Sequence, residues 1–110
     1  MPPRDARQLE KKATEAAGLL EAMANPRRLM ILCELAQGER SVSELVPVVG
    51  LQQAALSQHL ARLRSKGLVR TRRQAQMVFY RLASPAVIAI IETLAALFCA
   101  PGKSTKGRKS

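Results

Sequence analysis

The sequence predicts a mainly α-helical fold of five helices with one β-hairpin. Apolar residues recur at three- and four-residue steps over most of the 110 residues, as amphipathic helices require. Alternation at two-residue steps appears only around Gln74-Ala75, where it indicates a hairpin. The third observation concerns charge, because seven Lys and Arg but no acidic residue lie between Glu44 and Glu92. Such clustering is typical of a surface that meets phosphates.

The composition limits the number of domains and the class of partner. A chain of 110 residues allows one small domain, and 18 Lys and Arg against 8 Asp and Glu give a formal charge of +10. Aromatic residues are limited to Phe79, Tyr80 and Phe98, which weighs against single-stranded nucleic acid bound by base stacking. Double-stranded DNA is therefore the expected partner.

The two ends of the chain differ from its middle. Residues 1–5 are polar and charged, and no apolar segment behind them would make a secretory signal. The most apolar stretch, residues 86–100, is too short to span a membrane and contains Glu92. We expect a cytoplasmic protein with no membrane partner, whose domain comprises residues 6–101. Residues 1–5 and the basic tail 102–110 are expected to be disordered.

Two helices are predicted in the first third of the chain. The first spans roughly twenty residues, and Asn25 with Pro26 supplies the cap and first-turn proline of the second. Gly38 stops the second helix. The apolar positions are Ala6, Leu9, Ala13, Ala16, Leu20 and Met23 in the first helix, and Leu29, Leu32, Cys33 and Ala36 in the second.

A short helix and a longer one follow. Ser41 and Glu44 match a capping box that opens the short helix, which Pro47 should truncate or kink and Gly50 should end. The longer helix covers residues 53–66 and is closed by Gly67. Its packing stripe is Leu56, Leu60 and Leu63. Opposite the stripe lie Ala54, Gln58, Ala61 and Ser65, with Ser57, Arg62 and Arg64 on the flanks.

This small, polar and cationic outer face predicts a recognition helix. Small residues let a helix approach the floor of the major groove, Ser and Gln can bond base edges, and flanking Arg can hold phosphates. The alternative is an ordinary solvated helix face. The preceding short helix and the Gly-containing turn favour recognition.

A hairpin and a last helix complete the predicted fold. Strands at residues 68–73 and 76–82 would place Val78, Tyr80 and Leu82 on one face and Arg72 and Arg73 near the tip. A wing with these arginines would contact phosphates or the minor groove, whereas the alternative is a solvated edge hairpin. Ser84-Pro85 opens the last helix, and Pro101-Gly102 ends it. Its apolar surface is too broad for a small monomer and suggests dimerisation; it comprises Val87, Ile90, Ile91, Leu94, Leu97 and Phe98.

The chain also resembles a known family. The run SQHLARLRSKGLV at residues 57–69, followed by Arg72-Arg73 and by VFYRL at residues 78–82, is similar to the ArsR/SmtB family of winged helix-turn-helix repressors. The resemblance covers about residues 15–100. It implies a homodimer built from the first and last helices, which binds an operator of two-fold symmetry and leaves it when an inducer is sensed. Two departures are Gln52, where the family usually has a capping Ser, and Gln74-Ala75-Gln76, which replaces a Gly-containing wing tip.

The second departure points to one branch of the family. Residues 72–76 and residues 29–33 resemble the branch that includes BigR, SqrR and HlyU. That branch senses persulfides through one cysteine on the second helix and one on the last, and the resemblance assigns these roles to Cys33 and Cys99. Metal-sensing relatives carry Cys-x-Cys or His/Asp clusters that this chain lacks. Its one histidine, His59, is expected to support the helix or touch phosphate, so we expect no metal and no cofactor.

The spacing of packed helices suggests how such a pair could be selective. Packed helices lie about 8–10 Å apart, whereas a disulfide needs Cα atoms within about 7 Å. Each added sulfur lengthens the bridge by up to about 2 Å, so a polysulfide could span a gap that rejects a disulfide. Closing it would strain the second helix against the last and move the recognition helices out of register with the DNA.

The hypothesis is therefore a DNA-binding repressor that releases its operator when persulfide or polysulfide reacts at Cys33 and Cys99. Arg27 or Arg28 could favour a Cys33 thiolate if either pointed at the sulfur. Open alternatives are inert core cysteines, an oxidant or metal response, and a small thiol enzyme, for which no Cys-x-x-Cys or nucleophile and base pair is present. The residues expected to contact DNA are Gln53, Ala54, Ser57, Gln58, Arg62, Arg72, Arg73, Gln74 and Gln76.

Overall fold

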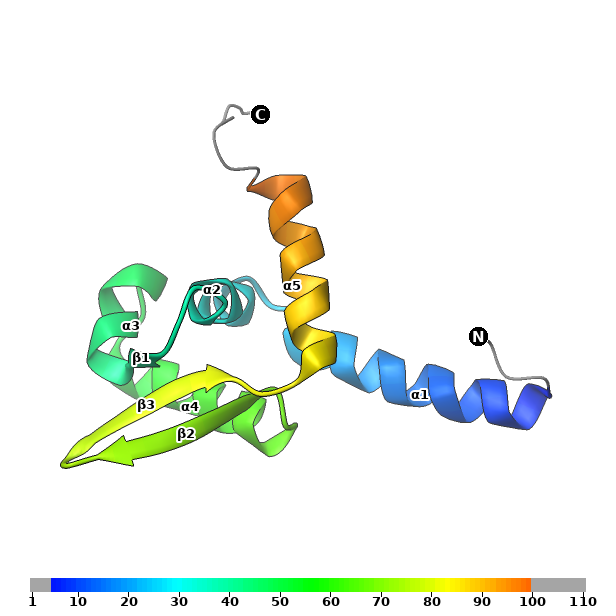
Figure 1. Ribbon diagram of the computed structural model, residues 1–110, viewed down its shortest axis with the longest axis horizontal. Helices are drawn as coiled ribbons and strands as arrows, with labels where there is room; N and C mark the ends of the chain where they lie inside the picture. Colours follow the sequence, from blue (N-terminus) through cyan, green and yellow to red (C-terminus); the bar gives the residue numbers. More distant parts are fainter. Residues whose placement is uncertain (1–4, 100–110) are drawn as a thin grey trace.

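The computed structural model describes residues 5–99, and within them the predicted five helices and hairpin are confirmed (Figure 1). A short strand that the sequence did not predict precedes the third helix. The elements are α1 (Ala6–Met23), α2 (Pro26–Leu35), β1 (Arg40–Ser41), α3 (Val42–Val49), α4 (Gln53–Ser65), β2 (Val69–Gln74), β3 (Met77–Leu82) and α5 (Pro85–Phe98).

The three strands form an antiparallel sheet in the order β1-β3-β2. Arg72 pairs with Phe79 across the hairpin, and Ser41 of β1 pairs with Phe79 from the other side. The turn falls at residues 75–76, one position later than predicted, and Ala75 has a φ of 56°. Strand β1 escaped prediction because two residues are too few to show alternation.

Side-chain caps fix where the helices begin. Asp5 belongs to the segment that the sequence predicts to be disordered, but it caps α1 and accepts a hydrogen bond from the Gln8 amide at 2.8 Å. Asn25 caps α2 through two amides, and Ser84 caps α5. Ser41 and Glu44 form the predicted capping box, with both reciprocal hydrogen bonds present. The helix starts are thus the part of the fold that local sequence determines most directly.

Gly50 ends α3 as predicted, in a left-handed conformation with a φ of 73°, whereas other details of the helix ends differ from prediction. Pro47 does not truncate α3, which continues to Val49 because Leu45 and Val49 lie one turn apart and are both fully buried. Helix α4 ends at Ser65, one residue early. Helix α5 ends at Phe98, with Cys99 as its C-cap just beyond the helix. Pro101-Gly102, the tail 102–110 and residues 1–4 lie outside the described residues.

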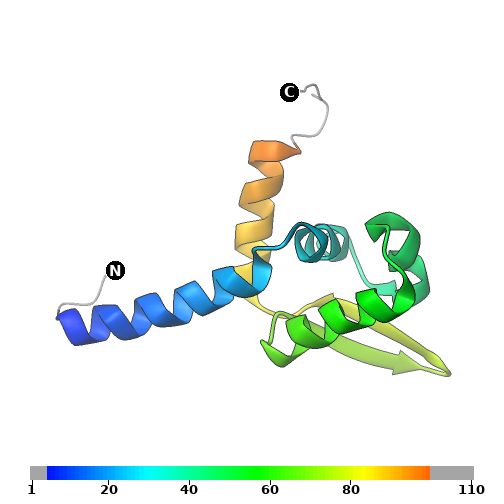
Figure 2. The same cartoon turned by 180° about the vertical axis from the view of Figure 1, so that it is seen from behind.

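The core lies between α2, α3, α4 and the base of the hairpin (Figure 2). The predicted stripe of α4, Leu56, Leu60 and Leu63, is completely buried. Tyr80 and Leu82 of β3 pack against the same core, as their predicted face requires. From α1 only Ala22 and Met23 are buried, and from α5 only Val87 and Ile91.

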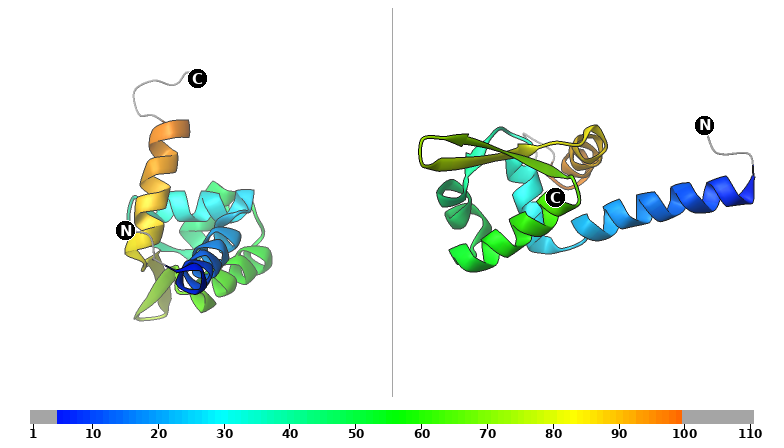
Figure 3. Two further views of the ribbon diagram at one scale, coloured as in Figure 1. Left: turned by 90° about the vertical axis from the view of Figure 1, so that its right-hand side faces the viewer. Right: turned by 90° about the horizontal axis from the view of Figure 1, so that it is seen from below.

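Helices α1 and α5 project from this core in different directions (Figures 1 and 3). Several apolar side chains on these two helices are left exposed: 52% of Leu9, 52% of Leu20, 70% of Leu97 and 80% of Phe98. Isolated exposed leucines are common, but rows of them along two helices are not. No helix within residues 5–99 is long and apolar enough to cross a membrane.

Candidate DNA-binding surface and cysteine cavity

Helix α4 presents the predicted outer face to solvent. With Leu56, Leu60 and Leu63 directed into the core, the opposite side of the helix is left exposed. Figures 1 and 2 place α4 and the β2–β3 hairpin along one side of the molecule, away from α5. The predicted DNA contacts on this helix are all exposed; they are Gln53, Ala54, Ser57, Gln58 and Arg62.

The position of α4 is fixed by a polar link to α2. The Arg28 guanidinium donates to the Ala22 carbonyl at 2.6 Å and lies 3.5 Å from Nδ1 of His59. Burial first, and the Arg28 charge second, lower the pKa of His59, which favours the neutral ring. His59 therefore supports the helix. In the part of the chain that the structure describes, no group of three or more His, Cys, Asp or Glu is placed to hold a metal ion.

The wing carries four predicted residues, and one of them contacts Glu39, a residue outside the wing that the sequence did not suggest. Arg73, Gln74 and Gln76 are exposed near the tip. Arg72 is exposed too, but its guanidinium is engaged: Nε lies 3.1 and 3.0 Å from the two carboxylate oxygens of Glu39, and Nη2 lies 2.7 Å from one of them. Nη1 donates to Gln74 at 2.8 Å, and the guanidinium lies 4.8 Å from the centroid of the Phe79 ring.

Glu39 was missed because it lies outside the acid-free segment. It follows α2 in the loop that leads to β1, 33 positions before Arg72. The hydrogen bond from Arg72 is the largest cause of the lowered pKa of Glu39; desolvation opposes it, and the charges of Arg72 and Arg81 lower the pKa further. Arg40 braces the loop because Nε bonds Glu34 at 2.9 Å and Nη1 donates to the Glu39 carbonyl at 2.8 Å.

The two cysteines line one cavity of about 500 Å³ between α2 and α5. Both thiols are free. Cys33 is half-buried on α2, whereas Cys99 is exposed at the end of α5. The other lining residues are Ala36, Gln37, Ile91, Glu92, Ala95 and Ala96.

The environment of Cys33 favours its protonated form. Burial raises the pKa of the Cys33 thiol, and the neighbouring Cys99 adds to the effect. The expected help from an arginine is absent: Arg27 donates to the Val49 carbonyl at 2.5 Å, and Arg28 is bound to Ala22. Both side chains point away because they cap backbone carbonyls of other elements.

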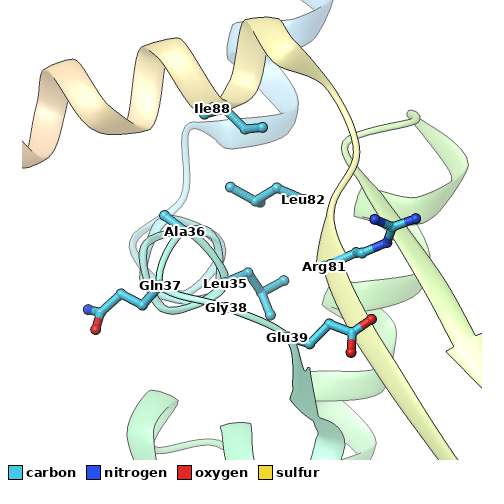
Figure 4. A pocket seen from close by; sticks show the side chains of 8 residues that line it. All are labelled: Leu35, Ala36, Gln37, Gly38, Glu39, Arg81, Leu82 and Ile88. Atoms are coloured by element: carbon cyan, nitrogen blue, oxygen red, sulfur yellow. The ribbon is translucent and has the colours of Figure 1, made fainter.

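A second cavity, of about 430 Å³, lies between the end of α2, β3 and the start of α5 (Figure 4). Leu35, Leu82 and Ile88 point into its middle, and Glu39 lies on the side toward β3. Ala36 and Gln37 line both this cavity and the cysteine cavity. The turn that follows α2 thus separates the two cysteines from the wing.

A short helix, a turn, a helix with a polar outer face and an arginine-bearing hairpin together define a winged helix-turn-helix domain. The family model described as "Bacterial regulatory protein, arsR family" matches residues 25–71. The chain is 53% identical over 93 residues to the biofilm growth-associated repressor of Agrobacterium fabrum, a match that covers 84% of this chain and 80% of the relative. The chain belongs to the arsR family of bacterial regulatory proteins.

Solved structures agree with this assignment. Reduced HlyU from Vibrio cholerae aligns with a TM-score of 0.82 at 55% identity, over 84% of this chain and 98% of that one. The repressor BigR from Xylella fastidiosa aligns with a TM-score of 0.78 at 41% identity, over 88% and 99%. The chain is therefore a transcriptional regulator and not an enzyme, so the alternative of a thiol enzyme is set aside.

Proposed function

We propose that this protein is a homodimeric repressor, acting in the cytoplasm, that releases operator DNA when a persulfide reacts at Cys33 and Cys99. The observation that carries the proposal is the shared cavity: two free thiols from helices far apart in sequence line the same 500 Å³ space. A relative whose structure is described as the reduced form, HlyU, supports a role for thiol state in this branch.

The proposed DNA contacts divide by chemistry. Gln53, Ala54, Ser57 and Gln58 would face base edges in the major groove, and Arg62 would hold a phosphate at the flank. From the wing, Arg72, Arg73, Gln74 and Gln76 would contact the backbone or the minor groove. The exposed apolar faces of α1 and α5 would be covered by the second copy, which sets the spacing of two half-sites.

The sulfur chemistry needs no separate oxidant. Each protein thiolate attacks the outer sulfur of a persulfide RS–SH, which leaves a protein persulfide and releases the thiol RSH. One protein persulfide then attacks the cysteine sulfur of the other. A trisulfide forms and HS⁻ leaves, so the electrons removed from the two cysteines reside in the released sulfide. Further sulfur transfer before closure would give a tetrasulfide.

The turn that follows α2 supports a structural link between the two thiols and the DNA-binding wing. A bridge across the cavity would draw Cys33 toward Cys99 and shift the turn that carries Ala36 and Gln37. That turn also walls the second cavity and leads to Glu39, whose carboxylate holds Arg72 of the wing. Displacing this turn would move the wing through Glu39, and it would move α4 through α2.

Repression, as opposed to activation, is part of the proposal. The Agrobacterium relative is named a repressor, whereas the Vibrio cholerae relative, 54% identical over 97 residues, is named a transcriptional activator. A reporter gene placed behind an operator that the protein selects from a random-sequence library would distinguish the two. Loss of the protein raises reporter output if the protein represses, and lowers reporter output if the protein activates.

The decisive experiment is the intact mass of the reduced protein after exposure to glutathione persulfide or, separately, to peroxide, with free thiols blocked before analysis. We expect a bridged product that retains extra sulfur only in the persulfide sample, together with release from DNA. Cys33→Ser and Cys99→Ser should each abolish the bridge and leave DNA binding unchanged.

Other outcomes would replace the proposal. Two free thiols in both samples would make the cysteines inert core residues and require a different inducer. A plain disulfide after peroxide would indicate a general oxidant switch. DNA binding that is the same for bridged and reduced protein would indicate an architectural DNA binder.

A further inference from the structure

The ion pair between the wing and the α2–β1 loop occupies a residue that the proposed function assigns to DNA. Arg72 makes three hydrogen-bond contacts with Glu39, from 2.7 to 3.1 Å, and a fourth to Gln74. The pair is partly exposed, with 47% of the Arg72 side chain and 28% of the Glu39 side chain accessible. A phosphate could therefore reach the guanidinium, but a carboxylate is already there.

Glu39 is held in place independently of Arg72. Arg40 bonds Glu34 on α2 with one nitrogen and the Glu39 carbonyl with another. On the wing, Arg72 pairs with Phe79, and Phe79 also pairs with Ser41 of β1. The carboxylate and the guanidinium are thus brought together by two braced segments, and the contact is not a chance meeting of two flexible side chains.

The negative charge of Glu39 makes its contact with Arg72 an obstacle to phosphate binding. Glu39 lies close enough to Arg72 and Arg81 for both charges to act on it, and it lies on a surface otherwise assigned to phosphates. Guanidinium groups bind carboxylate and phosphate through the same bidentate geometry. The two anions therefore compete for one partner, and a retained carboxylate would also repel the incoming phosphate.

We propose that Glu39 is a built-in competitor of DNA for the wing arginine Arg72, so that binding requires Arg72 to exchange Glu39 for a phosphate. The competitor lowers affinity for any duplex and so limits binding outside the operator, where the recognition helix adds no base contacts. This inference rests on the proposed contact between the wing and DNA. It concerns an electrostatic contact, and it holds whatever the cysteines sense.

The test uses the full chain and two duplexes: one selected by the protein from a random-sequence library, and one of mixed sequence without the selected site. Glu39→Gln is compared with Glu15→Gln, which changes the net charge equally and removes an exposed ion pair with Lys12 on α1 instead. We expect Glu39→Gln to bind both duplexes about three- to tenfold more tightly. The slope of log affinity against log salt should change by less than about 0.9 per Arg72, because the proposed exchange places Arg72 on a phosphate in both proteins. Glu15→Gln should leave the affinity and the slope near the wild-type values.

Two further variants separate failure of this inference from failure of the wing contact. Arg72→Gln should weaken binding, and adding Glu39→Gln to it should give a smaller gain than Glu39→Gln gives alone, because only the repulsion between the carboxylate and the phosphate remains to be relieved. If Arg72→Gln binds like wild type, the wing contact itself is wrong. If Arg72→Gln weakens binding but Glu39→Gln matches Glu15→Gln or binds more weakly, the wing contact stands and competition is overturned.

Discussion

The body of the molecule, from α2 to β3, and its two arms, α1 and α5, treat apolar side chains in opposite ways. In the body, leucines at the centre of the core are completely buried; Leu45, Leu56, Leu60 and Leu63 are examples, whereas Leu29 is partly buried. In the arms, Leu9, Leu20, Leu97 and Phe98 are at least half exposed. The same helical periodicity therefore marks an apolar face that is buried within the chain in one region and one that is left exposed in the other. An apolar stripe on a helix therefore predicts that the face will be buried, but it does not predict whether the same chain or a second one buries it.

The largest expected effect is a loss of stability in the body of the molecule. Leu60→Ala should lower the free energy of unfolding by about 2–5 kcal/mol, because it leaves a cavity where α4 packs on the core. Urea denaturation followed by circular dichroism measures the loss. Ala61→Ser, on the exposed face of the same helix, is the control and should cost less than about 1 kcal/mol. Equal losses from both variants would contradict the assignment of the buried face.

A smaller effect tests the arms. Leu20 is half exposed on α1. Leu20→Glu should raise the dimer dissociation constant by on the order of 100-fold, since it places a carboxylate within the proposed apolar contact between copies. Sedimentation velocity over a range of concentrations measures it. Lys11→Gln makes the same change of charge on the opposite side of α1 and should leave the constant unchanged. A monomer at every concentration for the wild-type protein would refute the second copy as the cover.

The smallest effect compares the two cysteines. Iodoacetamide should modify Cys99 on the order of tenfold faster than Cys33, because burial shields Cys33 and its raised pKa reduces the thiolate fraction. The rate at Cys33 should keep rising with pH beyond the ordinary thiol range, since a raised pKa delays deprotonation. Peptide mapping after timed alkylation measures both rates. Faster reaction at Cys33 near neutral pH would show that its environment favours the thiolate.

The sequence predicted the body well because its signals are local. Caps at Asn25, Ser41 and Ser84 lie within three residues of the amides they accept from, and the stripe of α4 repeats within one helix. The exposed face of α4 follows from its buried face by geometry alone. These parts of the candidate site were therefore predicted before any contact between elements was known.

What the sequence could not predict depends on contacts between distant segments. Strand β1 exists because Ser41 meets Phe79, and the wing arginine is neutralised because the loop after α2 brings Glu39 to it. The pKa of Cys33 is set by burial against α5, and the two nearby arginines in sequence turn elsewhere. The pattern of charged residues along the chain predicts the sign of the charge on a surface, but it does not predict which charged residues pair with one another.

The sheet order has a consequence for solubility. Strand β3 lies in the middle, so β2 forms one edge and the two-residue β1 forms the other. An open edge strand can recruit another sheet, and charged side chains or a very short edge prevent this. Arg70, Arg72 and Arg73 therefore keep β2 from adding to a neighbouring molecule's sheet. A variant that neutralises all three should aggregate in concentrated solution, so DNA-binding variants of the wing are best made one arginine at a time.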